Sequence, residues 1–74
     1  MAAAITERQR DVLMAIGRLT LERGFPPTVR EVGSALGRSS PSTVQSHIDA
    51  LIRRGYLASV PGSPRTLRVV RAPE

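Results

Sequence analysis

The sequence has 74 residues, enough for one small domain with a single core and too few for a roomy catalytic cleft. Cysteine is absent, no apolar run reaches the roughly 20 residues that cross a bilayer, and no secretory signal is present, so we expect a cytoplasmic protein without disulfides. Eleven basic residues against six acidic ones give a net charge of +5, which favours a polyanion partner but also fits a membrane surface or a ribosomal contact.

The first predicted helix runs from about Glu7 to Arg23. Thr6 and Gln9 have the spacing of a capping box, in which each side chain bonds the backbone amide of the other residue. Gly24 supplies a left-handed stop, and the two prolines after Phe25 prevent continuation. Apolar side chains recur at helical spacing and predict the buried face: Val12, Leu13, Ile16 and Leu19 or Thr20.

Two shorter helices follow. Thr28 and Glu31 form a second capping box that opens a helix from Val29 to Leu36, whose inner face we expect to be Val32, Ala35 and Leu36. Ser40 then caps a helix that starts at Pro41, where a missing N–H costs nothing, and runs to Arg54. Its apolar arc consists of Val44, Ile48, Leu51 and Ile52. The turn of residues 37–39 between these helices is typical of a helix-turn-helix.

After Gly55 the apolar period changes from helical to alternating. Residues 56–60 and 65–71 read as two strands, with Leu67 and Val69 on one face, and the turn Pro61-Gly62-Ser63-Pro64 joins them. The predicted fold is therefore α+β and mostly α: a three-helix winged helix-turn-helix over residues 6–71, with a C-terminal two-stranded β-hairpin wing. Residues 1–5 and 72–74 are expected to be tails.

The third helix carries the candidate reading surface. Its outer arc holds small hydroxyls and one amide, which suit close approach to base edges in a major groove. Because serine and threonine are poor helix formers on an exposed face, a functional role explains them better than propensity does. The candidate base-contacting residues are Ser42, Thr43, Gln45 and Ser46. Asp49 would repel DNA there, and we expect it to pair with Arg53 four residues on. His47, beside the apolar arc, is more typical of a packed side chain than of a metal ligand or base.

Candidate contacts to the phosphate backbone come from the second helix, both ends of the third helix and the wing. Some of these residues have simpler explanations, since Ser39 and Ser40 are good helix caps and the arginines that end the third helix complement its dipole. The arginine-only usage equally fits phosphate and guanine recognition or a GC-rich genome. The candidates are Thr28, Arg30, Ser39, Ser40, Arg53, Arg54, Arg65 and Arg68.

Four segments resemble the N-terminal DNA-binding domain of the LexA repressor family: ITERQRDVLMAIGR, GFPPTVREVGSALG, SSPSTVQSHIDALIRRGYL and PRTLRVV. The resemblance implies dimers on palindromic operators of DNA-damage response (SOS) genes in a bacterium or phage. It implies DNA contacts at Ser40, Ser42, Thr43, Gln45 and Ser46, with the wing on the backbone. Gln45 and Ser46 vary between branches of that family, so the resemblance does not define the base sequence read.

Two features depart from that family. Its members continue into a self-cleaving peptidase domain with a Ser-Lys dyad, which this lysine-free chain cannot supply, so we expect no enzyme, no cofactor, no metal and no small-molecule substrate. Met14 and Leu21, flanking Gly17, fall opposite the buried stripe of the first helix. This strip suggests an alternative function as a protein-interaction winged helix, unless a chain terminus covers it or the residues are scattered surface apolar groups.

Overall fold

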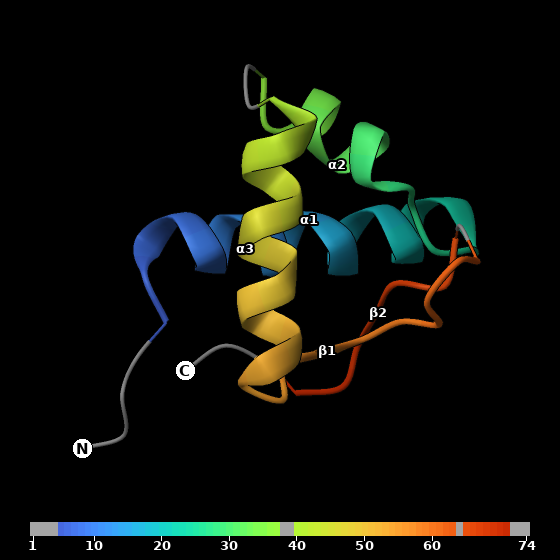
Figure 1. The fold of residues 1–74 in the computed structure, drawn as a ribbon. Coiled ribbons are helices and arrows are strands. Elements are labelled where there is room, and N and C mark those ends of the chain that lie inside the picture. Colours follow the sequence, from blue (N-terminus) through green and yellow to red (C-terminus); the bar gives the residue numbers. More distant parts are fainter. Residues whose placement is uncertain (1–4, 38–39, 64, 72–74) are drawn as a thin grey trace.

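Three helices and a short antiparallel hairpin follow one another in the computed structural model, which describes residues 5–37, 40–63 and 65–71. Helix α3 crosses in front of α1 in Figure 1, α2 lies beside the start of α3, and the hairpin lies along α1 near the end of α3. This arrangement confirms the predicted winged helix-turn-helix. The helices are α1 (Glu7–Arg23), α2 (Val29–Ala35) and α3 (Pro41–Arg53), and the strands are β1 (Leu57–Ala58) and β2 (Arg68–Val69).

Capping side chains set the helix starts as the sequence predicts. At α1 the Gln9 amide donates to the Thr6 hydroxyl and the Thr6 amide to the Gln9 side chain, both at 3.1 Å. At α2 the Glu31 amide donates to the Thr28 hydroxyl at 3.2 Å, and the Thr28 amide donates to the Glu31 carboxylate at 2.9 Å. These reciprocal bonds satisfy amides that have no partner within the helix.

The helix ends agree with the prediction to within one residue. Gly24 follows α1 with a φ of 81°, the left-handed conformation that a side chain disfavours. Helix α2 ends at Ala35 and α3 at Arg53, each one residue earlier than expected, because Leu36 and Arg54 are the C-caps. The cap at the start of α3 is Ser40, whose hydroxyl accepts from the Thr43 amide at 3.3 Å.

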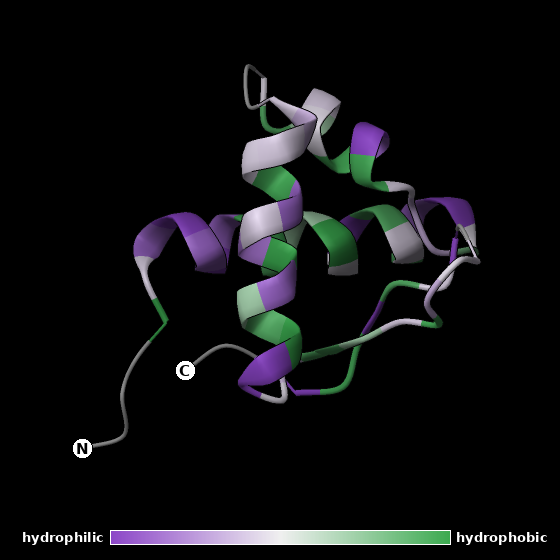
Figure 2. Cartoon of the chain, viewed as in Figure 1, coloured by the Kyte–Doolittle hydropathy of each residue, from purple (hydrophilic) through white to green (hydrophobic). Residues whose placement is uncertain are grey.

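One apolar core lies where the three helices and the hairpin meet (Figure 2). Val32, Val44 and Leu51 are fully enclosed, which confirms the inner faces predicted for α2 and α3 at these positions. Ala35 was wrongly placed on the inner face of α2: it is exposed, and Leu36 is only half-buried. The buried residues of α2 are Val32 and Gly33, so its inner face is turned toward Gly33 and away from Ala35. The core also includes Ile5, Val12, Leu13, Ala15, Ile16, Leu19, Ile48, Tyr56, Leu57 and Leu67.

The hairpin is much shorter than predicted. Leu57 pairs with Val69 and Ala58 with Arg68, and the rest of the predicted strands is loop. The Thr66 hydroxyl occupies the place of further ladder bonds, since it accepts from the Val60 amide at 2.9 Å and donates to the Ser63 carbonyl at 3.0 Å. A side-chain hydroxyl that bonds the local backbone competes with sheet pairing in this way.

Strand β2 rests on the middle of α1. A β-carbon built on Gly17 would lie 3.8 Å from the nearest methyl group of Val69, an ordinary contact distance. Val69 stays 37% exposed while Leu67 is buried, so only one of the two apolar residues predicted on this face enters the core. The hairpin therefore packs against α1 at Gly17, where there is room for a β-carbon.

Candidate nucleic-acid interface

The first two turns of α3 are open to solvent. Ser42, Thr43, Gln45 and Ser46 are all exposed, on the face away from the buried Val44 and Ile48 of the same helix. In Figure 2 the start of α3 is pale, as expected for small hydroxyl side chains, and no other element covers it in this view. The hydroxyl-rich start of the helix therefore projects outward and can enter a groove, as DNA reading requires.

Two of these side chains already have partners. The Thr43 hydroxyl lies 2.9 Å from that of Ser40, so one of these two hydroxyls donates to the other. Gln45 donates its side-chain amide to Asp49 at 2.9 Å. The expected pair of Asp49 with Arg53 is wrong, because among the described residues Asp49 bonds Gln45 instead. Gln45 and Arg53 each lie one helical turn from Asp49. The carboxylate of Asp49 accepts from the side-chain amide of Gln45, on its N-terminal side.

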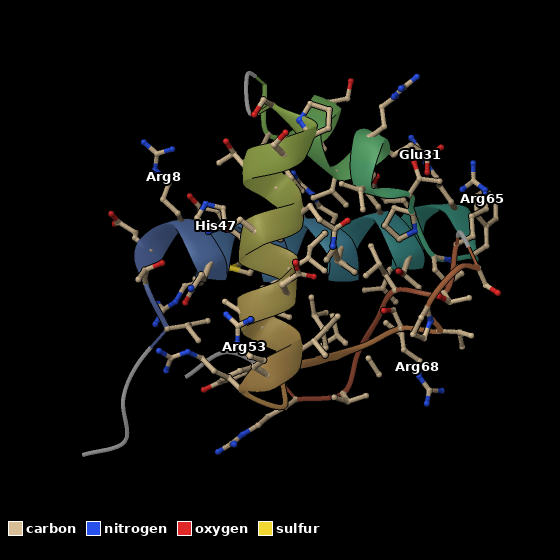
Figure 3. All side chains as sticks on the ribbon, viewed as in Figure 1. Arg8, Glu31, His47, Arg53, Arg65 and Arg68 are labelled. Atoms are coloured by element: carbon tan, nitrogen blue, oxygen red, sulfur yellow. The ribbon has the colours of Figure 1, made fainter. Side chains whose placement is uncertain are left out.

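The candidate backbone contacts lie on three elements. Arg30 on α2, Ser40 before α3 and Arg68 on β2 are exposed and available to a phosphate. Arg53 and Arg54 are exposed at the far end of α3, about 20 Å from Ser40 at 1.5 Å per residue. Figure 3 shows Arg53 and Arg68 pointing away from the body of the domain. Thr28 is half-buried, with its hydroxyl and amide both used in the α2 cap, and Ser39 lies outside the described residues.

Arg65 is not a free cation. Its guanidinium makes two parallel bonds to Glu31, each 2.9 Å long, and a third to the Pro26 carbonyl at 3.3 Å. It also lies 5.1 Å from the centre of the Phe25 ring. Figure 3 shows Glu31 and Arg65 side by side where the wing meets the start of α2. A phosphate would have to compete with Glu31 for this side chain, so the structure gives Arg65 a second role that the sequence did not reveal.

Glu31 also forms an ion pair with Arg23. An Arg23 nitrogen lies 3.1 Å from the same carboxylate oxygen that one nitrogen of Arg65 contacts. The hydrogen bonds from Arg65 lower the pKa of Glu31 from 4.5 to about 2, and the bond from the Thr28 amide contributes to this effect. The carboxylate therefore stays ionised at any physiological pH.

A groove of about 400 Å³ runs between α2, α3 and the wing. Its walls are the start of α2, the middle of α3 with Gln45 and Ile48, and the wing loop, where Arg65 lines one end. The groove places one candidate base reader and the wing on either side of a single channel.

A second depression brings together residues that are far apart in the sequence. Arg8 and Asp11 of α1 line it with Ser40, Thr43 and His47 around the start of α3. Arg8 is exposed, and in Figure 3 it points outward on the same side of the domain as His47. Sequence reasoning missed Arg8, because only the crossing of α1 and α3 brings it near the reading end of α3.

The apolar strip predicted on α1 is exposed at both ends and covered in the middle. Met14 is 57% and Leu21 88% exposed. Val69 of the wing packs over Gly17 between them, which divides the strip into two separate apolar positions. A continuous docking surface along this helix is therefore weaker than the sequence suggested.

Metal and membrane sites find no support in the part of the chain that the structure describes. No three side chains of His, Cys, Asp or Glu gather there to hold a metal ion. No helix among these residues is long and apolar enough to cross a membrane.

Helix order, the wing, the open start of α3 and the arginines around it together define a winged helix-turn-helix DNA-binding domain. Residues 2–66 match the family described as the LexA DNA binding domain, and the chain belongs to that family.

Several curated LexA repressors are similar to the chain over most of its length. The repressor of Thermobifida fusca is 47% identical over 68 residues, covering 92% of this chain and 27% of that protein. The repressor of Pediococcus pentosaceus is 48% identical over 71 residues, covering 96% of this chain and 34% of that protein. The repressor of Desulfitobacterium hafniense strain DCB-2 is 39% identical over 66 residues, covering 89% of this chain and 32% of that protein. The chain thus spans about a quarter to a third of the length of these relatives.

Proposed function

We propose that this chain binds a specific duplex DNA sequence and acts as the operator-binding part of a LexA-type transcriptional repressor. Helix α3 enters the major groove, with Ser42, Thr43, Gln45 and Ser46 facing base edges. The single observation that carries this proposal is the exposure of these four side chains at the capped start of α3. The positive net charge and the family membership support it.

The phosphate backbone is held from both sides of α3. Arg30 and the wing loop line the groove on one side of α3, and Ser40 with Arg8 lines the second depression around the start of α3. Arg68 is exposed on β2. Arg53, Arg54 and Thr28 remain further candidates, as does Ser39. Each neutralised phosphate adds to the salt dependence, so binding should weaken steeply as salt rises.

One domain of this size has a small interface, and tight binding therefore needs two copies on a palindromic operator. The relatives bear the name LexA repressor, which supports regulation of DNA-damage genes in the bacterial cytoplasm. Residues 6–71 are the unit that binds, without cofactor, metal or catalytic activity.

Selection of bound duplexes from a random pool at low salt tests the proposal. The expected result is one enriched motif with inverted half-sites about 10 base pairs apart, centre to centre, or a multiple of that. Enrichment of no sequence above the starting pool would overturn sequence-specific binding. A protein-interaction domain acting through Met14 and Leu21 predicts that outcome together with no shift of a random duplex at low salt.

A further inference from the structure

Glu31 lies where three parts of the domain meet. It belongs to the first turn of α2, its partner Arg23 to the last turn of α1, and its partner Arg65 to the wing loop. We call these three residues the Glu31 ion-pair cluster. One oxygen of the carboxylate accepts from the Thr28 amide and from Arg65. The other accepts from Arg65 and lies 3.1 Å from an Arg23 nitrogen.

The cluster is one of the contacts that hold the wing, together with the Thr66 hydroxyl bonds and the buried Leu67. Among the described residues two pairs form the β ladder, and residues 59–63 and 65–67 lie outside it. Arg65 has a φ of 60°, the one non-glycine residue with positive φ among those described. A backbone in this region is held by its surroundings, and here the surroundings are Glu31, the Pro26 carbonyl and the Phe25 ring.

The cluster also borders the groove beside α3, because Arg65 lines it. Residues 27–30, at and before the start of α2, form one wall and residues 59–63 and 65–67 the other, with Gln45 of α3 between them. A bidentate arginine–carboxylate pair fixes both distance and orientation between the two walls. The side chains of the cluster are a quarter to two-fifths exposed, so solvent screens their attraction and their main effect is geometric.

We propose that Glu31 is a positioning residue for DNA binding, which holds Arg65 and thereby sets the wing at the distance from α3 that the duplex requires. In this role Arg65 joins the wing to α2 and is not a phosphate contact. The inference rests on the proposed function, and it assigns the backbone contact of the wing to Arg68.

The direction in which Glu31→Gln changes the affinity for DNA tests the proposal. Glu31→Gln removes a negative charge, which by electrostatics alone should tighten DNA binding. The amide still allows a capping box, since Gln9 makes the equivalent bonds at α1, so α2 should keep its start. We expect Glu31→Gln to weaken binding to the selected duplex by roughly threefold to thirtyfold, the range for residues that act through a neighbour.

Glu22→Gln is the matched control, because it removes the same charge from an exposed position on α1 near Arg23. It should leave binding unchanged or slightly tighter. Arg65→Lys keeps the charge of the wing but cannot make two parallel bonds, and should weaken binding as Glu31→Gln does. If Glu31→Gln binds as well as the control, the positioning role is wrong.

Salt dependence separates positioning from direct contact. Arg65→Ala should weaken binding while the slope of log affinity against log salt stays that of the wild type. A slope smaller by about 0.9 would identify Arg65 as a phosphate contact and overturn the proposal. The double variant Glu31→Gln with Arg65→Ala should bind no more weakly than Arg65→Ala alone, and additive losses would also overturn it.

Amide exchange without DNA tests the same role independently. In Glu31→Gln the Val60 amide, which bonds Thr66 in the wing, should exchange faster while amides of α1 and α3 keep their wild-type rates. Faster exchange throughout would mean a merely structural residue. If the wild type binds no duplex, the proposed function fails, yet this measurement still decides whether Glu31 holds the wing.

Discussion

Gln45 and Asp49 are joined along the outer face of α3 by a hydrogen bond of 2.9 Å from the glutamine amide to the carboxylate. The bond fixes the Gln45 side chain before DNA arrives. It leaves the amide oxygen free to accept from a base. The carboxylate of Asp49 is a negative charge one helical turn from Gln45. The two residues therefore affect binding in opposite directions.

Gln45→Ala should relax base preference rather than abolish binding. Loss of one well-placed amide contact costs about 1–3 kcal/mol of discrimination at a single base pair. Repeating the duplex selection with the variant should yield the wild-type motif with one symmetric pair of positions randomised. Equal weakening on the selected duplex and on a random duplex would contradict the assignment of Gln45 as a base reader.

Asp49→Asn should tighten binding to every duplex by roughly threefold at low salt, because it removes a charge that repels phosphate. The asparagine oxygen can still accept from Gln45, so the preferred sequence should stay the same. Asp49→Ala removes the bond as well and should alter preference at the position that Gln45 reads. Titrations of selected and random duplexes, followed by anisotropy, measure both effects. No gain in affinity for Asp49→Asn would place this turn of α3 outside the reach of the phosphates.

Arg68→Ala should weaken selected and random duplexes alike and reduce the salt slope by about 0.9, as expected for one lost phosphate contact. Arg68 is exposed on the short strand that defines the wing. Arg18→Ala is the control, since Arg18 is exposed on α1 away from the groove and should change neither quantity. If Arg68→Ala keeps the wild-type slope of log affinity against log salt, Arg68 is not part of the interface with DNA.

Gly17→Ala should stabilise the domain. Its new β-carbon would sit at an ordinary 3.8 Å from Val69, and alanine is preferred to glycine inside a helix by about 0.5–1 kcal/mol. The melting temperature should rise by roughly 4–8 °C per kcal/mol gained. The same substitution at Gly24, where φ is 81°, should destabilise instead. A destabilised Gly17→Ala would show that the wing packs more tightly on α1 than this distance indicates.

Acid should weaken the Glu31 ion-pair cluster only at very low pH. The pKa of Glu31 in the folded protein is about 2, below its ordinary value of 4.5, so its contribution is present above 4.5 and is lost as pH falls towards 2. The difference in unfolding free energy between wild type and Glu31→Gln should therefore be constant above about pH 5 and shrink below it. Urea titrations at several pH values measure this difference. Its disappearance already near pH 4 would mean that Arg65 does not hold the carboxylate in solution.

Local rules predicted the helices of this domain well. The two capping boxes, the proline after Ser40 and the glycine after Arg23 act within a few residues, so the sequence alone places the ends of α1, α2 and α3 to within one residue. The exposed face at the start of α3 follows from helical periodicity in the same way.

The sequence alone did not predict the contacts between segments that are far apart along the chain. Arg65 lies 34 residues from Glu31, and nothing in its local pattern distinguishes it from a free arginine on a wing. Alternation of apolar residues predicted long strands, but the Thr66 hydroxyl took the backbone groups that the ladder would have used. Arg8 was overlooked because its place beside Thr43 depends on how α1 and α3 cross.

The Tyr56 carbonyl accepts from the Val70 amide at 2.9 Å, and Arg71 lies 5.3 Å from the centre of the Tyr56 ring. Arg71, the last residue that the structure describes, therefore lies near the end of α3, about 20 Å from Ser40. A fluorophore, a surface tether or a fused protein attached there should leave the major-groove side unobstructed. Attachment at this point is the natural choice for immobilising the domain when its duplexes are selected.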